Sequence, residues 1–531
     1  MTDHTLAALV AAAAVLVLAT VRHWKTAIFA PAPLPRDTSD PSKRWPKQPP
    51  TVPFLGHQLV LNANSDRFLD LFLEWRLKYG PGYELTIPGR RMIDINHPVW
   101  LEHVQKTQFD NFGRAHLMPV LGGVQRTGIF NSDGRHWQVQ RKAATHAFSR
   151  NHFKGPIRDK IGAHVKIVVD LFDNLAATGQ VFDFQDVMAR FTMLLSLAVA
   201  FSEPAGLADC LTADPACLER RYKFVDAFDE ASPLIDSRNR NALWQLTERT
   251  TSRGHARAIQ TAVDAIYDFI NPLVKARLAT TKAGVKNRTG DLLDLFMEHE
   301  SDPWTLSGWM ASMLFAGRDT TAFTITWQMY ELLRPGNAGQ NLLGRARAEV
   351  AELGHQFHHS AKDADTLDYD DMKGLTLHNA MWQETTRVHP AAARGTPTVC
   401  YRDTVLPAIA DIGQPAVVVR KGDVVIWQDW VYNRLPEVWG DDCLDYRPER
   451  FLDGETGSLR NVSMWTWHSF NAGPRTCLGK TLATFEALSL LSALLPRYDF
   501  EMADPGMQAK YTTGLNMGIE QGLRLRVRRR E

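Results

Sequence analysis

The stretch "SFNAGPRTCLG", residues 469 to 479, holds a single cysteine, Cys477, among small and basic residues. The chain contains five cysteines, and none of the others lies near Cys477 in the sequence. Disulfide frameworks and structural zinc sites need cysteines in groups, so this spacing argues against both. The lone thiol therefore indicates a different kind of site.

The residues around Cys477 suit a thiolate that binds a metal. A helical pattern, "LGKTLATFEALSLLSALL", follows directly, and this places the sulfur at a helix N-terminus, where the dipole favours negative charge. Gly473 and Gly479 allow the backbone to approach and to point N–H groups at the sulfur. Phe470 can shield it from water, and Arg475 is a planar donor suited to a carboxylate. A haem iron with propionate groups fits these features, and a thiolate ligand on that iron favours O–O cleavage.

A second unusual stretch, "LFAGRDTTAFTITW" at residues 314–327, lies inside a predicted helix of residues 303–334. Asp302 is a suitable N-cap for this helix. About 30 residues would span on the order of 45 Å, enough to cross the globule. Gly317 costs about 1 kcal/mol relative to alanine in a helix interior, and the adjacent threonines are poor helix formers. Such departures in an otherwise strong element indicate a functional site.

Each departure has a chemical interpretation. A small residue, Gly317, makes room for a flat cofactor and bound O₂. Thr320 can donate to the backbone carbonyl four residues earlier and loosen the helix groove. Asp319 can relay protons from solvent. Taken by itself, the stretch is also compatible with an ordinary buried helix that contains a packing glycine.

Together the two stretches resemble motifs of the cytochrome P450 monooxygenases. The haem-binding signature Phe-x-x-Gly-x-Arg-x-Cys-x-Gly is matched by Phe470, Gly473, Arg475, Cys477 and Gly479. The segment from Ala316 to Thr321 resembles the oxygen-activating motif Ala-Gly-x-Asp-Thr-Thr. The resemblance implies haem b with Cys477 as axial ligand and Arg475 on a propionate. It also implies Ala316 and Gly317 beside the cofactor, with Thr320 and Asp319 as the catalytic residues.

Two further resemblances concern residues around the haem. Glu384 and Arg387 in "QETTRVHP" match the family's Glu-x-x-Arg, which pairs with the arginine of "RPERF", here Arg450. This triad is expected to support the folded haem pocket without a role in turnover. Trp137 and Arg141 resemble donors to a haem propionate. Without the resemblance, their spacing of four would indicate a cation–π pair at the surface.

One part of the chain departs from the family pattern. The family usually has a basic residue in the strand after its His-Pro segment, where it reaches a propionate. This chain has Pro397 and Thr398 at about that place, followed by a longer insertion, "AIADIGQP". Arg394 is the candidate substitute.

The pattern of elements predicts a mainly α protein with a smaller β-rich portion. "GYELTI" and "RMIDIN" read as short strands around a Pro-Gly turn, and helical patterns dominate residues 133–390. Strand-like runs follow, "PAVVVRKGDVVIW" and the terminal "GLRLRVRR". The resemblance implies the cytochrome P450 fold, a helical bundle around haem with additional sheets, in one catalytic domain of residues 54–531.

The N-terminal part differs in kind. The run "TLAALVAAAAVLVLATV" carries no charge and precedes a basic cluster, which predicts a retained membrane anchor over residues 1–25 with the rest of the chain in the cytosol. A cleaved signal peptide is the alternative, but no lysine or arginine precedes the apolar run. Residues 26–53 are proline-rich and predict a stiff linker. We expect a single-pass protein of the endoplasmic reticulum membrane.

Charge and motifs limit the partners. The chain has 60 Lys and Arg residues against 59 Asp and Glu, a net charge of +1, so composition gives no support for nucleic acid as a partner. No dinucleotide or flavin fingerprint is present, so electrons are expected from a separate NADPH–cytochrome P450 reductase.

The resemblance is nearest to the eukaryotic fatty-acid and alkane ω-hydroxylases, through "TGIFNSDGRHWQVQRKAATHAF", "AGRDTT" and "AFDEASPLI". It implies insertion of one oxygen atom from O₂ at or near a fatty-acid terminus. Hydroxylation or epoxidation of another lipophile (an alkane, terpene or sterol) is an alternative, and a haem protein without oxygenase activity is another. By family position, the candidate pocket residues are mostly apolar; they are Leu117, Met118, Phe315, Ala316, Ala391, Ala392, Ala393, Leu515 and Met517.

Overall fold

The computed structural model describes residues 49–114, 117–202, 206–282, 290–357, 367–512 and 514–531. The chain divides into two compact units. The sheet unit holds the described residues up to Gly113 together with Asp236–Arg257 and Arg394–Tyr432. The helical unit holds Arg114–Ile235, Ala258–Ala393 and Asn433–Glu531.

The sheet unit is built on a five-stranded sheet of order β1-β2-β8-β5-β3. Its strands are β1 (Gly82–Ile87), β2 (Arg90–Ile95), β8 (Val424–Ile426), β5 (Thr398–Cys400) and β3 (Phe112–Gly113). β1 and β2 pair antiparallel from Gly82↔Ile95 to Ile87↔Arg90, and β2 pairs parallel with β8. Gly89 turns the hairpin at a φ of 72°, a conformation that favours glycine. The two strands predicted around a Pro-Gly turn are confirmed.

Short elements complete the sheet unit. A separate two-stranded sheet consists of β6 (Thr404–Leu406) and β7 (Val417–Val419). The predicted run "PAVVVRKGDVVIW" therefore forms two strands, β7 and β8, that belong to different sheets. The helices wholly within the unit are α2 (Gln58–Ala63), α3 (Phe68–Tyr79), α4 (Pro98–Glu102), α11 (Trp244–Arg249) and α18 (Asp429–Tyr432).

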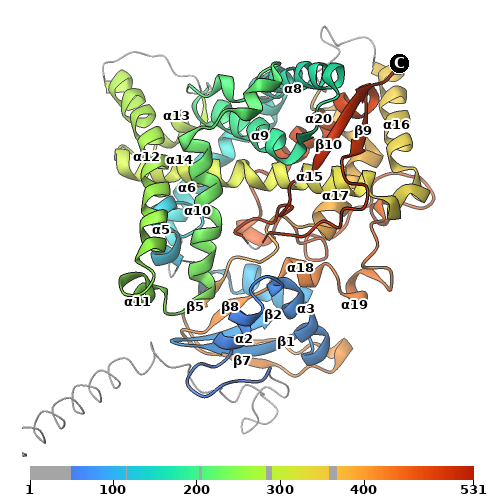
Figure 1. Ribbon diagram of the computed structural model, residues 1–531. Helices are drawn as coiled ribbons and strands as arrows, with labels where there is room; N and C mark the ends of the chain where they lie inside the picture. Colours follow the sequence, from blue (N-terminus) through green and yellow to red (C-terminus); the bar gives the residue numbers. More distant parts are fainter. Residues whose placement is uncertain (1–48, 115–116, 203–205, 283–289, 358–366, 513) are drawn as a thin grey trace, which may run out of the picture. The chain divides into compact units, whose positions relative to one another are not determined.

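The helical unit contains most of the helices (Figure 1). Its earlier helices are α5 (Met118–Gln125), α6 (Gly134–Ala147), α7 (Arg150–His152), α8 (Arg158–Thr178), α9 (Phe184–Phe201) and α13 (Leu292–Met297). The later ones are α14 (Pro303–Gly317), α15 (Asp319–Leu333), α16 (Leu342–Phe357), α17 (Thr376–Val388), α19 (Pro436–Trp439) and α20 (Lys480–Arg497). Two more, α10 (Lys223–Arg240) and α12 (Arg253–Lys282), have residues in both units.

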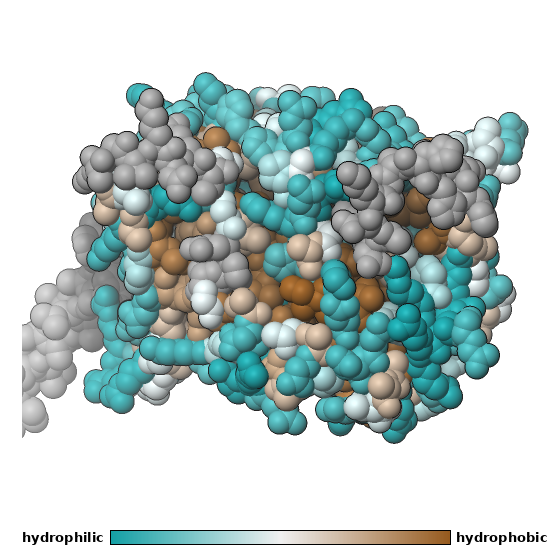
Figure 2. Space-filling view, turned by 90° about the horizontal axis from the view of Figure 1, so that it is seen from above, coloured by the Kyte–Doolittle hydropathy of each residue, from teal (hydrophilic) through white to brown (hydrophobic). Residues whose placement is uncertain are grey.

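The core of the helical unit forms around α9 and α15. These two helices pack against each other, and α15 also contacts α17 and α20. Of the described helices, α9 is long and apolar enough to cross a membrane, but 83% of its apolar window is buried inside the protein. It is a core helix. Figure 2 shows hydrophilic residues around the edge of one face of the molecule and hydrophobic residues gathered between them.

A small antiparallel sheet of order β4-β10-β9 also belongs to the helical unit. It consists of β4 (Phe182–Asp183), β10 (Arg524–Arg529) and β9 (Tyr498–Met502). Along β10, Leu525 and Val527 are buried while the arginines beside them are exposed. This alternation explains the basic C-terminal run as a terminal strand with one solvated face.

The predicted class, mainly α with a smaller β-rich portion, is confirmed by these elements. The predicted helix of residues 303–334 is present as two successive helices, α14 and α15, with a break at Arg318. Asp302 caps α14 as expected, because its carboxylate accepts the Thr305 N–H at 2.9 Å. The predicted anchor, residues 1–25, and all but the last part of the predicted linker lie outside the described residues.

Candidate active site

The segment before α20 holds Cys477 in a tight loop. The Cys477 N–H donates to the Phe470 carbonyl at 2.9 Å. Gly473 has a φ of 65°, which favours glycine, and it begins a 3-10 turn that ends at Arg475. Helix α20 then begins at Lys480. The predicted helix start directly after the cysteine is confirmed.

Donor groups converge on the Cys477 sulfur. Burial raises the pKa of this thiol, while N–H groups of Gly479 and Lys480 and the charge of Arg141 oppose the rise. A Cβ added to Gly479 would lie 3.9 Å from the sulfur, so the backbone does approach closely. Cys477 itself is exposed. Because a metal deprotonates a coordinating thiol outright, these donors fit a thiolate ligand.

The other four cysteines are buried. Cys400, in β5, donates from its sulfur to the Arg402 carbonyl at 2.9 Å and accepts from the Asn111 amide at 3.8 Å. Burial raises the pKa of Cys400 to about 11, which stabilises the neutral thiol. Cys477 is therefore the cysteine whose surroundings suit a metal ligand.

Arg475 lies between an aromatic ring and a carboxylate. Its guanidinium is 4.6 Å from the centroid of the Trp137 ring, and it donates to Asp133 at 2.6 Å and to the Ser132 carbonyl at 3.0 Å. Trp137 is only 8% exposed. The alternative of a surface cation–π pair between Trp137 and Arg141 is therefore wrong, because the tryptophan is buried and its cation is Arg475.

Arg114 adds a second guanidinium to this cluster. Its backbone N–H donates to both Asp133 oxygens, at 3.0 and 2.8 Å. Burial and the nearby Arg475 charge, opposed by Asp133, together lower the pKa of Arg114 to about 9. Among the described residues, no hydrogen-bond partner is found for its buried Nε. Two guanidiniums near one carboxylate leave surplus positive charge, which fits the propionates of a haem.

Arg141 connects helix α6 to the cysteine loop. Its Nη1 donates to the carbonyl of Thr476 at 2.5 Å. Burial lowers the pKa of Arg141, and the neighbouring Cys477 opposes this shift. Trp137 and Arg141 thus both contact the cysteine loop, at Arg475 and at Thr476. Propionate contacts of the first two remain a prediction.

At the break between α14 and α15, Thr320 behaves as predicted. Its hydroxyl donates to the Ala316 carbonyl, four residues earlier, at 2.6 Å. Arg318 interrupts the helix with φ −74° and ψ −76°. An interior threonine with this bond loosens the backbone groove, and the Thr320 hydroxyl lies two residues after the interruption at Arg318.

Asp319 follows directly and is 3% exposed. Burial raises the pKa of its carboxyl, while Arg318, at 2.9 Å, and the amide of Asn516 oppose that rise. A carboxyl with a raised pKa can both accept and release a proton closer to neutral pH than an exposed one. The burial of Asp319 therefore suits the proton-relay role predicted for it.

Gly317 has a packing role that the sequence did not predict. A Cβ added there would lie 2.5 Å from the Ser196 hydroxyl of α9. Because real Cβ contacts are never this short, the glycine lets α9 and α14 approach closely. A cofactor contact of Gly317 remains a prediction beside this packing role.

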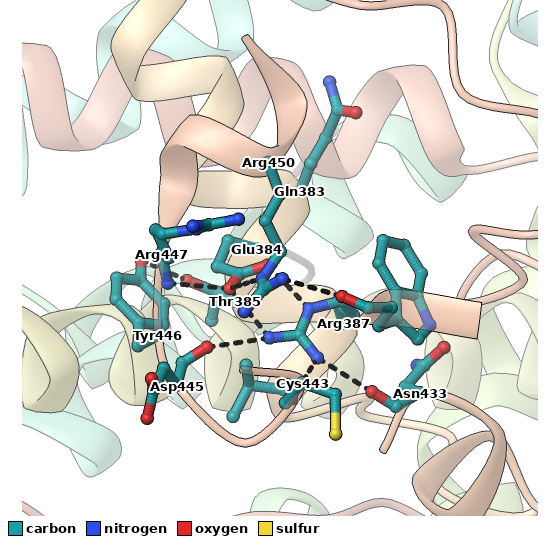
Figure 3. Close-up of polar contacts among 12 residues, drawn as sticks. Gln383, Glu384, Thr385, Arg387, Asn433, Cys443, Asp445, Tyr446, Arg447 and Arg450 are labelled. Carbon is teal, nitrogen blue, oxygen red and sulfur yellow. Dashed lines mark hydrogen bonds and ion pairs between the residues drawn. The ribbon is translucent and has the colours of Figure 1, made fainter. Parts of the chain in front are cut away.

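The predicted triad is present and buried (Figure 3). Arg387 donates to both oxygens of Glu384 at 2.7 Å. Its guanidinium also donates to three backbone carbonyls, those of Asn433, Cys443 and Asp445. Planar, bidentate pairing of this kind is the strong form of an arginine–carboxylate contact.

Arg450 completes the triad from a later segment. Its Nε donates to Glu384 at 3.3 Å, and its Nη1 donates to Asp442 at 2.6 Å. The backbone N–H of Arg447 also donates to Glu384, at 2.7 Å. The triad therefore joins α17 to residues 433–450 through buried, charge-assisted bonds. The predicted role as a folding scaffold agrees with this arrangement.

The candidate pocket residues lie on four segments. Leu117 is buried just before α5, and Met118 is the first residue of that helix. Phe315 is buried on α14, where its ring is 4.4 Å from that of Phe228 on α10. The Met517 N–H donates to the Ala391 carbonyl at 2.8 Å. The turn of residues 515–517 is thus joined to the segment of residues 391–393.

Arg394 has a partner in the sheet unit. Its guanidinium forms an ion pair with the buried carboxylate of Asp236 and lies 5.5 Å from the centroid of the Phe68 ring. Arg240 approaches the same carboxylate at 3.3 Å. The structure thus assigns Arg394 an ion-pair role; a propionate contact stays a prediction.

Sequence reasoning missed Arg114 and Asp133. The sequence pattern around these two residues gives little indication of their role, because Asp133 contacts Arg475 across a separation of 342 residues. One local cue was available, since Asp133 directly precedes Gly134, whose φ of 56° starts α6. An acidic residue at the entry of a helix that carries Trp137 and Arg141 could have been proposed as their partner.

Comparison with known proteins agrees with this geometry. The family model described as "Cytochrome P450" matches residues 46–521. The chain is 32% identical over 484 residues to cytochrome P450 monooxygenase cyp1 of Mycosarcoma maydis, which covers 88% of this chain and 71% of the relative. It is 26% identical over 498 residues to cytochrome P450 94B3 of Arabidopsis thaliana, with 91% and 92% covered.

A third relative is cytochrome P450 94A1 of Vicia sativa, 24% identical over 500 residues, with 91% of each protein covered. The family model spans most of the chain, well beyond the two motifs. The chain therefore belongs to the cytochrome P450 monooxygenases, a family of enzymes that bind haem b through an axial cysteine thiolate.

Proposed function

We propose that this enzyme hydroxylates fatty acids at or near the terminal carbon, with Cys477 as the axial ligand of its haem. The observation that carries the ligand assignment is the set of donors around Cys477, which are the N–H groups of Gly479 and Lys480 and the charge of Arg141. Arg475 and Arg114 would hold the propionates. The fatty-acid assignment rests on the resemblance of the motifs and on the apolar pocket candidates.

Haem b, when bound, supplies the activation of O₂ and the insertion of one oxygen atom into a C–H bond. The chain's own contribution is to position groups and move protons. Asp319 takes up a proton at its buried carboxylate and releases it towards the Thr320 hydroxyl. Thr320 holds that hydroxyl at the helix break through its bond to Ala316. With the haem bound, Phe470 would help to shield the Cys477 sulfur from water.

The pocket candidates suit a long apolar chain. Phe315 is buried against Phe228, and the backbone hydrogen bond from Met517 to Ala391 joins the segments that carry the other candidates. Such surfaces bind alkyl chains through burial, at roughly 25 cal/mol per Å². Leu117, at the entry of α5, would extend the same apolar lining.

Cytochromes P450 take electrons from a redox partner, and we propose an NADPH–cytochrome P450 reductase as that partner. We also place the enzyme in the endoplasmic reticulum membrane through residues 1–25. Removal of these residues is expected to release the protein from microsomal membranes into the supernatant. Retention of the shortened protein in the membrane would contradict the anchor.

The substrate assignment is tested by reductase-dependent conversion of a fatty-acid panel, with products located by mass spectrometry. We expect terminally hydroxylated acids that require NADPH and reductase. If protein with a thiolate-type reduced CO spectrum converts no acid but does convert an alkane, terpene or sterol, the fatty-acid proposal is wrong and the haem chemistry stands.

A further inference from the structure

Two segments that carry the sequence resemblance meet in one ion-pair network of the helical unit. Arg318 comes from "AGRDTT", and Asp229 comes from "AFDEASPLI" on α10. The Nη1 of Arg318 lies 2.5 Å from Asp229 and 2.9 Å from Asp319. One nitrogen therefore bridges two carboxylates from different helices.

Exposure differs along this network. The Asp229 side chain is 54% exposed, whereas those of Arg318 and Asp319 are 2% and 5% exposed. Solvent thus reaches the first carboxylate, and the arginine separates it from the buried one. The Thr192 hydroxyl holds the Arg318 carbonyl at 2.9 Å, so the backbone of the arginine is fixed while its guanidinium serves both acids.

We propose that Asp229 is a positioning residue for proton entry, which acts by drawing the Arg318 guanidinium away from Asp319. This proposal rests on the proposed function, in which Asp319 and Thr320 handle protons. When the guanidinium turns to Asp229, Asp319 loses its counter-charge and takes a proton from solvent water. When the guanidinium returns, Asp319 releases that proton towards Thr320 and becomes a carboxylate again. Over one such cycle the charge of the network returns to its starting value, because the proton taken from water is the proton passed to Thr320.

The surrounding charges are compatible with this exchange. Burial and Asp229 raise the pKa of Asp319, and Arg318 and the Asn516 amide lower it. Burial lowers the pKa of Arg318, but Asp319, Asp229 and Asp186 more than offset this, so the guanidinium stays charged. Asp186, on α9, is itself paired with Arg190 at 2.8 Å. On α20, Glu486 hydrogen-bonds the neighbouring Thr321.

The first test is Asp229→Asn, in reductase-supported turnover with hydrogen peroxide and product both measured across pH. Without the Asp229 charge, Arg318 pairs with Asp319 alone and the pKa of Asp319 falls. Coupling is the amount of product formed per NADPH consumed. We expect the pH at which this ratio declines to move down, on the order of one pH unit. Peroxide formed per NADPH should rise several-fold at neutral pH, and Asp229→Glu should restore most of the coupling.

Asp226→Asn is the matched control. Asp226 lies on the same helix and pairs with Arg221 at 3.3 Å, away from Asp319. Its pH profile should equal that of the wild type. Equal profiles for Asp229→Asn and Asp226→Asn would overturn the proposal.

Difference infrared spectroscopy gives a readout that needs no turnover. The carbonyl band of the protonated Asp319, identified by its loss in Asp319→Asn, is titrated in wild type and Asp229→Asn. A lower midpoint in Asp229→Asn supports the proposal, and an unchanged midpoint contradicts it. If fatty acids are not converted but the midpoint shifts, the substrate assignment fails and the positioning role stands.

Arg318→Lys covers the case in which Asp229→Asn does not fold. A lysine keeps the charge but lacks the fork that bridges two carboxylates. In this background Asp229→Ala should leave the Asp319 midpoint unchanged, whereas in the wild-type background it should lower the midpoint. The same response in both backgrounds would contradict the bridge.

Discussion

At the scale of single residues, the buried triad shows that one carboxylate can bind several donors at once. Glu384 accepts from Arg387, Arg450 and the Arg447 backbone, and both guanidiniums are nearly inaccessible to solvent. Removing one partner of a buried pair leaves an uncompensated charge. The cost of losing Glu384 is therefore set mainly by the buried Arg387 guanidinium, because Arg450 keeps its ion pair with Asp442 at 2.6 Å.

We predict that Glu384→Ala lowers the free energy of unfolding by about 3–5 kcal/mol, the range for breaking a buried pair. Denaturant unfolding followed by circular dichroism measures this loss. Asp170→Asn is the control, because Asp170 forms an exposed pair with Lys166 and should change stability by less than about 1 kcal/mol. Equal small losses in both variants would refute the scaffold role.

Thr320 and Thr326 allow a matched test on one helix. Both hydroxyls donate to a carbonyl four residues earlier, but Thr326 does so to Ala322, away from the helix break. Thr320→Ala should separate NADPH consumption from product formation, with peroxide as the excess product. Thr326→Ala should stay coupled. A normal yield of product per NADPH in Thr320→Ala would contradict the proposed proton-transfer role of this hydroxyl.

Local motifs made several residues predictable. Cys477, Arg475, Thr320 and Asp319 stand in contiguous stretches whose residue types match their chemistry. Arg114 was not predictable, because its role depends on Asp133 and Arg475 and the latter lies far along the chain. Pairwise contacts across hundreds of residues leave no periodic or compositional signal.

At the scale of elements, the contact between α20 and α15 carries a buried acid. Glu486 is 3% exposed and hydrogen-bonds Thr321. Burial raises the pKa of Glu486 to about 8, whereas in the unfolded chain it is about 4.3. The folded state therefore holds a proton that the unfolded state has released between these two values.

It follows that this group makes the free energy of unfolding fall as pH rises from about 4 to about 8, with no further loss above that range. Glu486→Gln should flatten the slope, and Glu352→Gln, at an exposed position on α16, should leave it unchanged. Unfolding midpoints measured across pH test this. A wild-type slope retained in Glu486→Gln would show that Glu486 is ionised in the folded protein.

The helix break at Arg318 was not predictable from the pattern of apolar residues. Leu314, Phe315, Phe323 and Ile325 continue the helical repeat on both sides of it, and no proline intervenes. The break coincides with the ion pairs of Arg318 to Asp229 and Asp319. Tertiary contacts of this kind override local propensity, and the glycine and threonines only indicated that the region is unusual.

At the scale of the whole molecule, the class of elements was predictable and the division into two units was not. The sequence predicts one catalytic domain from residue 54, without an internal boundary. The sheet unit gathers three separate segments, and one of its boundaries, between Ile235 and Asp236, falls inside helix α10. Composition has no shift at such a point, because contacts between distant segments define the unit.

The central claim is that Cys477 is the axial ligand of the haem, and the reduced CO difference spectrum tests it most directly. We predict a thiolate-type band for the wild-type protein and for Cys400→Ser, since Cys400 is buried in β5 with partners of its own. Cys477→Ser should lack that band while remaining folded by circular dichroism. A thiolate-type band that persists in Cys477→Ser, or that is lost in folded Cys400→Ser, would contradict the account.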